Sequence, residues 1–526
     1  MLDTLIRGGN IVDGTGAPRF KADLAIDDGR VVDVGSLEGA EASKTLDATG
    51  MIVSPGFIDI HSHSDFTLLV DPRAQSSIAQ GATTEVIGNC GHGCAPLTKP
   101  KSFVGNIYGY SDAIEMDWRT TEGYLERMGA ARPAVNVAAL VPNGNLRLAV
   151  MPRTEAPATP DEIAQMGHLL EEGLEAGAFG YSTGLESPDE RASTEEETAE
   201  LCRIVARRGA LYATHTRNKE TLAVEAVEEG IRVAHAAGVQ LQVSHIIPRK
   251  GGPPDALERA IDAVDRAAAR SLDVTFDQHT RLHGITPISA ALPAWAFEGG
   301  ADSLAARLRE PVFRSEMKLR ESLFSSFALG GWDRVYLYQS KGNPDLVGKS
   351  FEELAPSGGD AYDALFDILL EECEEPHASL AVCHSYEEDQ LRYTFRHPLC
   401  MVGSDATALG TDGPLAGDVF LGAFTWAGWF FRRLVRETGD LTIEEAVAKL
   451  AAAPADRLGI ADRGRIARGS CADVVVFDAA GFAERGTLES PNRLATGVAH
   501  VVVNGVVSME DGALTSDRGG HVLRRG

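Results

Sequence analysis

Side chains that can bind a metal or move a proton follow several short apolar runs of this chain. The runs end in Asp59-Ile60-His61-Ser62-His63, Asn89-Cys90, Thr214-His215, Ser244-His245 and Ser404-Asp405. His61 and His63 are two residues apart, so on an extended strand both imidazoles point to the same side. Because imidazole, thiolate and carboxylate groups are common ligands of Zn²⁺, these residues indicate a metal site.

Each of these side chains also has an ordinary structural interpretation. A single buried histidine held by a backbone hydrogen bond is commoner than a metal ligand, and an aspartate after a strand, such as Asp405, is a typical helix N-cap. Cys94, four residues after Cys90, is a rival ligand. The pair of His61 and His63, with two further histidines and an aspartate at the ends of similar runs, favours one shared site.

The elements that must position these side chains alternate regularly. Short apolar runs are followed by segments of amphipathic helical period, which is typical of βα units around a parallel sheet. Capping-box patterns begin such helices near Thr159, Ser193 and Thr442. The carboxyl ends of the strands of a (β/α)₈ barrel meet on one face, so donors far apart in sequence would come together there. We therefore predict an α/β fold with a TIM-like (β/α)₈ barrel.

The two ends of the chain differ from this middle. Short strands separated by Asp-Gly turns fill the first fifty residues, and a similar pattern returns only near residues 473–507. We expect residues 1–54 and 456–526 to form a small β-sandwich domain from both chain ends. Residues 55–455 would then form the barrel, with a lid-like insertion around residues 285–345.

Composition limits the classes of function. The chain has 526 residues, of which 44% are hydrophobic and 24% charged, as in soluble globular proteins. Its net charge of −27 repels phosphate backbones and anionic membrane surfaces, so we expect a small-molecule substrate and neither nucleic acid nor membrane as partner. Seven scattered cysteines do not suggest a disulfide framework. Without a visible signal or transit peptide, a cytoplasmic location is expected.

Three segments carry a resemblance to a known family. Ser54-Pro55-Gly56-Phe57-Ile58-Asp59-Ile60-His61-Ser62-His63-Ser64-Asp65, followed much later by Gly403-Ser404-Asp405, resembles the amidohydrolase superfamily of metal-dependent barrels. Gly81-Ala82-Thr83-Thr84-Glu85-Val86-Ile87-Gly88-Asn89-Cys90-Gly91 is similar to the N-acyl-D-amino-acid deacylase (D-aminoacylase) branch, in which a cysteine replaces a carbamoylated lysine. The closing stretch, residues 462–478, agrees as well.

The resemblance implies roles for the candidate residues. Cys90, His215 and His245 would hold a tightly bound zinc, and His61, His63 and Asp405 would form a second, weaker site. Cys94 would then only pack. In the implied mechanism, zinc lowers the pKa of a water molecule, and Asp405 takes its proton and returns it to the departing nitrogen.

The resemblance is weakest where members of that branch hold the substrate carboxylate. They use a lysine two residues after the second zinc histidine, a tyrosine and an arginine, whereas Ile247 stands at the lysine position here. Arg249, Lys250 and Arg281 are either alternative carboxylate ligands or solvated surface residues. His279 and His283 are either polar contacts of the pocket or, as is commoner, ordinary loop or core histidines.

The function that we predict is hydrolysis of the amide bond of an N-acyl (D-)amino acid or a related N-acyl compound. The first alternative is hydrolysis of a cyclic amide, carbamate, ester or uncharged amide on the same site. The second alternative is a metal-binding barrel without turnover.

Overall fold

The core of the molecule is a parallel eight-stranded barrel. The computed structural model describes residues 1–98, 107–357 and 359–526. The barrel strands are hydrogen-bonded in the order β16-β12-β11-β10-β9-β8-β7-β6, and every pair is parallel. Their bounds are β6 Phe57–Asp59, β7 Ala82–Ile87, β8 Asn136–Pro142, β9 Gly180–Gly184, β10 Leu211–His215, β11 Gln240–Val243, β12 Val274–Gln278 and β16 Cys400–Val402.

Contacts just beyond the first and last strands close the barrel. Ser62 and Ala406 form a parallel bridge. On either side of it the Asp405 amide donates to the His61 carbonyl at 2.8 Å, and the His63 amide donates to the Ala406 carbonyl at 2.8 Å. The predicted (β/α)₈ barrel is confirmed, and its closure joins the His61–His63 segment directly to Asp405.

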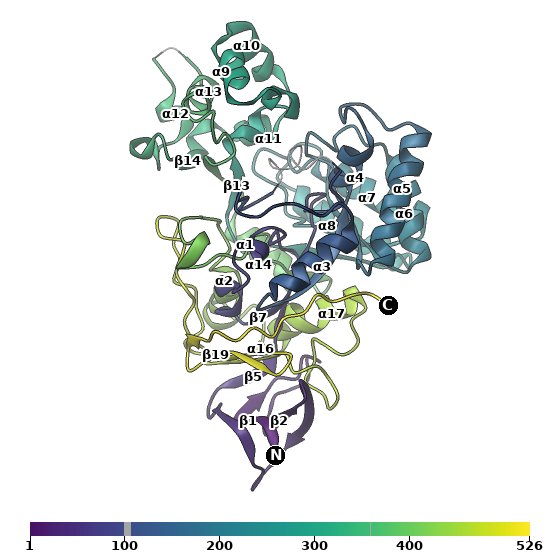
Figure 1. Ribbon diagram of the computed structural model, residues 1–526, viewed down its shortest axis with the longest axis vertical. Helices are drawn as coiled ribbons and strands as arrows, with labels where there is room; N and C mark the ends of the chain where they lie inside the picture. Colours follow the sequence, from purple (N-terminus) through teal and green to yellow (C-terminus); the bar gives the residue numbers. More distant parts are fainter. Residues whose placement is uncertain (99–106, 358) are drawn as a thin grey trace.

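Helices follow the strands and pack around them (Figure 1). Two of the three expected helix starts are capping boxes, at Thr159 and Thr442. The start expected at Ser193 is wrong by one residue, because Thr194 is the N-cap and its side chain accepts from the Glu197 amide. The helices of this part are α1 Thr67–Val70, α2 Gln75–Ile78, α3 Thr121–Ala131, α4 Asn143–Val150, α5 Pro160–Glu175, α6 Glu195–Arg207, α7 Ala223–Ala237, α8 Ala256–Ala269, α14 Glu388–Arg396, α15 Trp426–Phe430, α16 Ile443–Val447 and α17 Ala453–Leu458.

Both chain ends contribute to one nine-stranded sheet below the barrel (Figure 1). Its strands are β1 Leu2–Ile11, β2 Phe20–Asp27, β3 Arg30–Gly35, β4 Ala42–Asp47, β5 Ile52–Pro55, β17 Val474–Phe477, β18 Val498–Val503, β19 Val506–Glu510 and β20 Ala513–Leu514. Strand β1 pairs first with β4 and then with β5, so the sheet divides along its length. Apolar side chains of both ends, such as Leu24 and Val474, share one buried core, and the expected β-sandwich is confirmed.

A long insertion separates β12 from β16. It contains an antiparallel sheet of order β13-β15-β14, covered by helices, and has a buried core of its own (Figure 1). Its elements are β13 His283–Pro287, α9 Gly300–Arg309, α10 Pro311–Leu319, α11 Leu323–Ala328, β14 Val335–Gln339, α12 Phe351–Leu354, α13 Ala361–Glu371 and β15 Leu380–His384. The excursion expected at residues 285–345 lies inside this longer segment.

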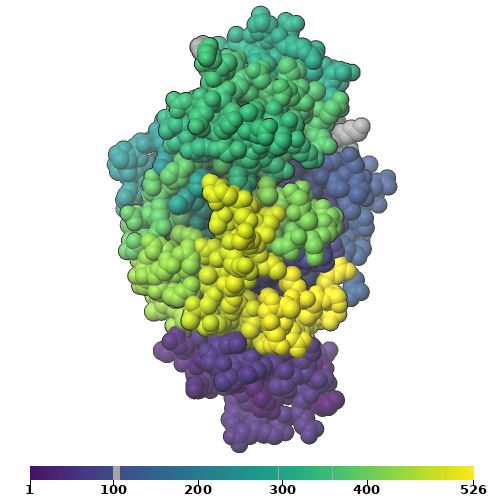
Figure 2. Space-filling model, turned by 90° about the vertical axis from the view of Figure 1, so that its left-hand side faces the viewer, coloured from purple at the N-terminus to yellow at the C-terminus, as the bar shows by residue number. Residues whose placement is uncertain are grey.

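Figure 2 shows where the two chain ends and the insertion lie on one face of the molecule. The C-terminal residues cross the molecule between the N-terminal strands below and the insertion above. In the described part of the chain, none of the helices combines the length and apolar character needed to span a bilayer.

Candidate metal centre and substrate cavity

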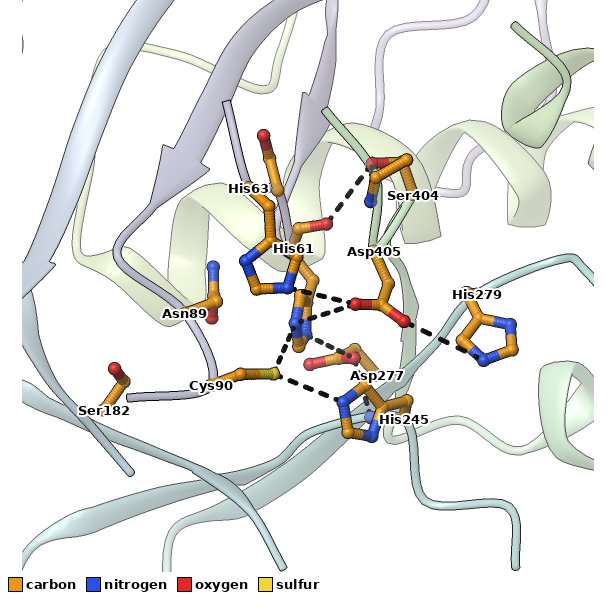
Figure 3. Close-up of polar contacts among 12 residues, drawn as sticks. His61, His63, Asn89, Cys90, Ser182, His245, Asp277, His279, Ser404 and Asp405 are labelled. Carbon is orange, nitrogen blue, oxygen red and sulfur yellow. Dashed lines mark hydrogen bonds and ion pairs between the residues drawn. The ribbon is translucent and has the colours of Figure 1, made fainter. Parts of the chain in front are cut away.

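Four potential ligand atoms meet at the carboxyl end of the barrel (Figure 3). His61, Cys90, His245 and Asp405 each lie two or three residues beyond a barrel strand. Their nitrogen, sulfur and oxygen atoms all lie within 4.8 Å of one another. The structure thus brings together four of the six side chains expected to bind metal.

The thiol of Cys90 is the centre of this group. Its Sγ lies 3.2 Å from His61 Nε2 and 3.3 Å from His245 Nε2. Burial alone would raise the pKa of the thiol, but the neighbouring His61 and His245 hold it well below its usual value. Cys90 is therefore a thiolate, the form that binds metals. Cys94 instead packs in the apolar core, where burial raises its pKa.

The other two expected ligands lie at the edge of the group. His63 Nε2 is 3.1 Å from Asp405 Oδ1. The ring of His215 packs against that of His245, with 4.6 Å between the ring centroids, while its Nε2 lies 2.8 Å from Glu186 Oε2. Both histidines therefore contact members of the four-atom group without belonging to it.

The backbone is unusual at three of the four central residues. The φ angles of Cys90, His245 and Asp405 are 53°, 35° and 46°, in the left-handed region that residues other than glycine rarely adopt. Such conformations persist where the surrounding structure imposes them, and they cluster at functional sites. All three residues lie two or three positions beyond a barrel strand, where their side chains meet.

Asp277, at the end of β12, orients two of these residues. Its Oδ1 lies 3.1 Å from His61 Nδ1 and accepts from the His245 amide at 2.9 Å. This contact leaves His61 Nε2 facing the thiolate. Sequence reasoning gave Asp277 no role, although it follows an apolar run as the expected ligands do.

Arg281 holds the carboxylate of Asp405. Its Nη2 pairs with Asp405 Oδ2, and its Nη1 donates to the Ser404 carbonyl at 2.8 Å. Burial would raise the pKa of Asp405, but Arg281 and the neighbouring histidines hold it well below its usual value. Asp405 is thus an ionised carboxylate with Oδ1 directed at the histidines.

The donor set suits zinc. A thiolate, imidazole nitrogens and one carboxylate oxygen are the ligand types that Zn²⁺ prefers. The low pKa of the thiol indicates that the surroundings already stabilise negative charge on its sulfur. These residues fit a bound zinc ion.

A cavity of about 1230 Å³ opens from this centre toward the insertion. Of the five residues expected to contact substrate, Arg249 and Arg281 line it, whereas Lys250, His279 and His283 are not among the described residues that do. Lys250 pairs with Glu387 at 2.6 Å. The rings of His279 and His283 pack against Tyr386 and His384.

One cavity residue was missed by the sequence reasoning. Lys219, in the segment after β10, places its Nζ 2.6 Å from His245 Nδ1. Burial and the nearby Arg249 lower its pKa to about 8. Its position four residues after His215 is the only sequence signal that would have indicated it.

The fold and the site together define a class of protein. A parallel barrel that gathers a thiolate, imidazoles and a carboxylate at its strand ends is the architecture of a metal-dependent hydrolase. Residues 44–509 match the amidohydrolase family. The chain belongs to this family, whose members are metal-dependent hydrolases of carbon–nitrogen bonds.

Characterised relatives extend over the whole chain. It is 34% identical to an N-acyl-D-glutamate deacylase of Alcaligenes xylosoxydans xylosoxydans, over 100% of this chain and 97% of that protein. The crystal structure of N-acyl-D-glutamate deacylase from Bordetella bronchiseptica, complexed with zinc and a phosphonate inhibitor that mimics the tetrahedral intermediate, is 32% identical. It covers 99% of both chains, with a TM-score of 0.83. A D-aminoacylase structure is 30% identical, covers 100% of both chains and has a TM-score of 0.82.

Proposed function

We propose that this protein hydrolyses the amide bond of an N-acyl-D-amino acid or a closely related N-acyl compound, and that it uses zinc. The observation that carries the proposal is the buried group of Cys90, His61, His245 and Asp405 facing a large cavity. The deacylases that resemble the chain over its full length support the choice of substrate class.

We propose that Cys90, His215 and His245 hold the tighter metal and that His61, His63 and Asp405 form a second site. The contact of Cys90 with His245 and the packing of the His215 ring against His245 support the first set, and the 3.1 Å contact between His63 and Asp405 supports the second. The central four-atom group takes members from both sets, so the two sites would lie side by side.

The bound zinc, Asp405 and Arg281 would have separate roles in the proposed amide hydrolysis. A zinc ion bound here would lower the pKa of a water molecule and polarise the substrate carbonyl. Asp405 is ionised and buried, so it can accept the proton of the attacking water. It then donates that proton to the departing nitrogen, which leaves readily only as an amine. Arg281 holds Asp405 Oδ2 and so fixes Oδ1 on the reacting side.

Release of free amine from paired substrates tests this proposal. The zinc-loaded protein should hydrolyse N-acetyl-D-amino acids faster than their L enantiomers and faster than six-membered cyclic amides. A chelator should abolish the activity and added zinc should restore it. A preference for cyclic amides, or activity that survives complete removal of metal, would overturn the proposal.

Variants of two aspartates test the proton transfer. Asp405→Asn should retain the fold and lose about 10²- to 10⁴-fold in kcat, the usual contribution of general acid–base catalysis. Asp412→Asn is the matched control, because Asp412 is exposed and its carboxylate contacts Arg73 and Gln75 among the described residues. Equal kcat values for Asp405→Asn and the wild type would exclude Asp405 as the proton shuttle.

A further inference from the structure

Lys219 is a buried cation at the inner end of the cavity. Its exposed fraction is 3%, and it lines the cavity together with His245 and Arg249. The ammonium group donates to the His245 carbonyl and lies 2.6 Å from His245 Nδ1. One imidazole ring therefore separates Lys219 Nζ from the Cys90 thiolate.

Lys219 differs from the neighbouring cations of the cavity in its contacts, since no carboxylate among the described residues pairs with it. Arg249 pairs with Glu186 and with Glu220, and Arg281 pairs with Asp405. Within the described part of the chain, Lys219 forms no ion pair with a carboxylate. No carboxylate contacts the Lys219 ammonium group directly, so an anionic ligand group that reaches it would form a charge-assisted contact in a buried place.

A second cationic group lies beside Lys219. The Arg249 amide donates to the Lys219 carbonyl at 2.6 Å, which ties the two segments together. Glu220 and Glu186 occupy Nε and Nη2 of Arg249, whereas Nη1 has no hydrogen-bond partner among the described residues. Arg249 Nη1, and the ammonium hydrogen of Lys219 that His245 does not take, are therefore the donors left for a ligand in the cavity.

We propose that Lys219, assisted by Nη1 of Arg249, binds the carboxylate of the substrate. This inference rests on the proposed function. The carboxylate of an N-acyl amino acid sits on the carbon bonded to the scissile nitrogen, so it must lie close to the metal centre. Lys219 is the described cation that combines this closeness with burial and the absence of a carboxylate partner. An ammonium–carboxylate contact at this point orients the amide over the centre.

A matched substrate pair isolates this contact. The substrates are an N-acyl-D-amino acid and its carboxamide, which has nearly the same shape but no negative charge, and the readout is the ratio of their kcat/KM values. Lys219→Met should reduce the acid-to-carboxamide ratio about 10- to 100-fold, as expected for the loss of one charge-assisted hydrogen bond. Lys219→Arg should restore part of the ratio. Lys349→Met, at an exposed site in the insertion, is the control and should leave the ratio unchanged.

Using a ratio cancels any general loss of active protein, and zinc content is measured for every variant. An unchanged ratio in Lys219→Met would overturn the inference while leaving the proposed function intact. Loss of zinc from both Lys219 variants would also overturn it, because Lys219 would then serve the metal centre. A wild-type protein that hydrolyses neither substrate would instead refute the proposed function.

Discussion

At the scale of single residues, the histidines at the centre are fixed through their second nitrogens. His61 Nδ1 faces the Asp277 carboxylate, and His245 Nδ1 faces the Lys219 ammonium group. In both residues Nε2 lies toward the thiolate, 3.2 Å from Cys90 Sγ in His61 and 3.3 Å in His245. A carboxylate partner such as Asp277 orients a metal-binding histidine and increases the basicity of its ring.

Asp277→Asn tests the orienting contact. The amide retains the shape of the side chain but removes its charge, so zinc affinity should fall about 10- to 100-fold, as is usual for such partners. Competition with a fluorescent chelator measures this affinity directly. Asp255→Asn is the control, because Asp255 is exposed and pairs only weakly with Arg259. Equal zinc affinities for Asp277→Asn and the wild type would show that Asp277 does not orient the ligands.

The sequence contains enough information to predict which side chains meet at the barrel end, but not the partners of those side chains. His61, Cys90, His245 and Asp405 follow strands of one alternating pattern, and barrel geometry makes such strand ends converge. The partners depend on how separate loops approach each other in space. Lys219 meets His245, 26 residues away, only because β10 and β11 are neighbours, and a one-dimensional pattern does not encode that contact.

At the scale of elements, the insertion is a layer with a hydrophobic core of its own. Its helices and its three-stranded sheet bury a core that includes Phe324, Leu337 and Phe366. The inner side of this layer supplies cavity residues such as Leu292 and Phe327, so it forms the wall opposite the barrel loops. Arg191 ties it to the barrel by donating to the Glu321 carbonyl at 2.7 Å.

Phe324→Ala tests this independence. Phe324 is fully buried in the core of the insertion, and loss of its ring should cost about 3–5 kcal/mol of local stability. Hydrogen exchange should therefore accelerate in residues 283–384 and remain slow in the barrel strands. Leu319→Ala, at a site that is 88% exposed, should change neither. Equal acceleration in the barrel and the insertion would show that they unfold as one unit.

The extent of the insertion was harder to predict than its existence. Its later part, through α13 and β15, is a helix followed by an apolar strand, which is the same local pattern as a barrel repeat. Only the antiparallel pairing of β15 with β13 and β14 shows that this strand lies outside the barrel.

At the scale of the whole molecule, strand pairing joins the two chain ends to each other, and a buried carboxylate joins them to the barrel. Strand β5 pairs with β17, which lies more than 400 residues later. Asp473 is buried beside Arg463 and also accepts from Asn136 Nδ2, in barrel strand β8, at 3.0 Å. One carboxylate thus connects the C-terminal segment with the first residue of a barrel strand.

Arg463→Met should destabilise the whole protein. It leaves the Asp473 carboxylate buried without its cation, which typically costs about 3–5 kcal/mol. The exposed pair of Arg465 with Asp456 provides the control, and Arg465→Met should cost at most about 1 kcal/mol. Urea unfolding measures both. Similar midpoints for the two variants would contradict this account of how the ends are joined.

The central claim is that Cys90 and the histidines around it form a zinc site, and X-ray absorption at the zinc edge tests it most directly. The zinc-loaded protein should show a sulfur ligand at about 2.3 Å and imidazole nitrogens at about 2.0–2.1 Å. The sulfur signal should vanish in Cys90→Ser and persist in Cys94→Ala. A zinc shell without sulfur in the wild type, or a sulfur signal that survives in Cys90→Ser, would contradict the account.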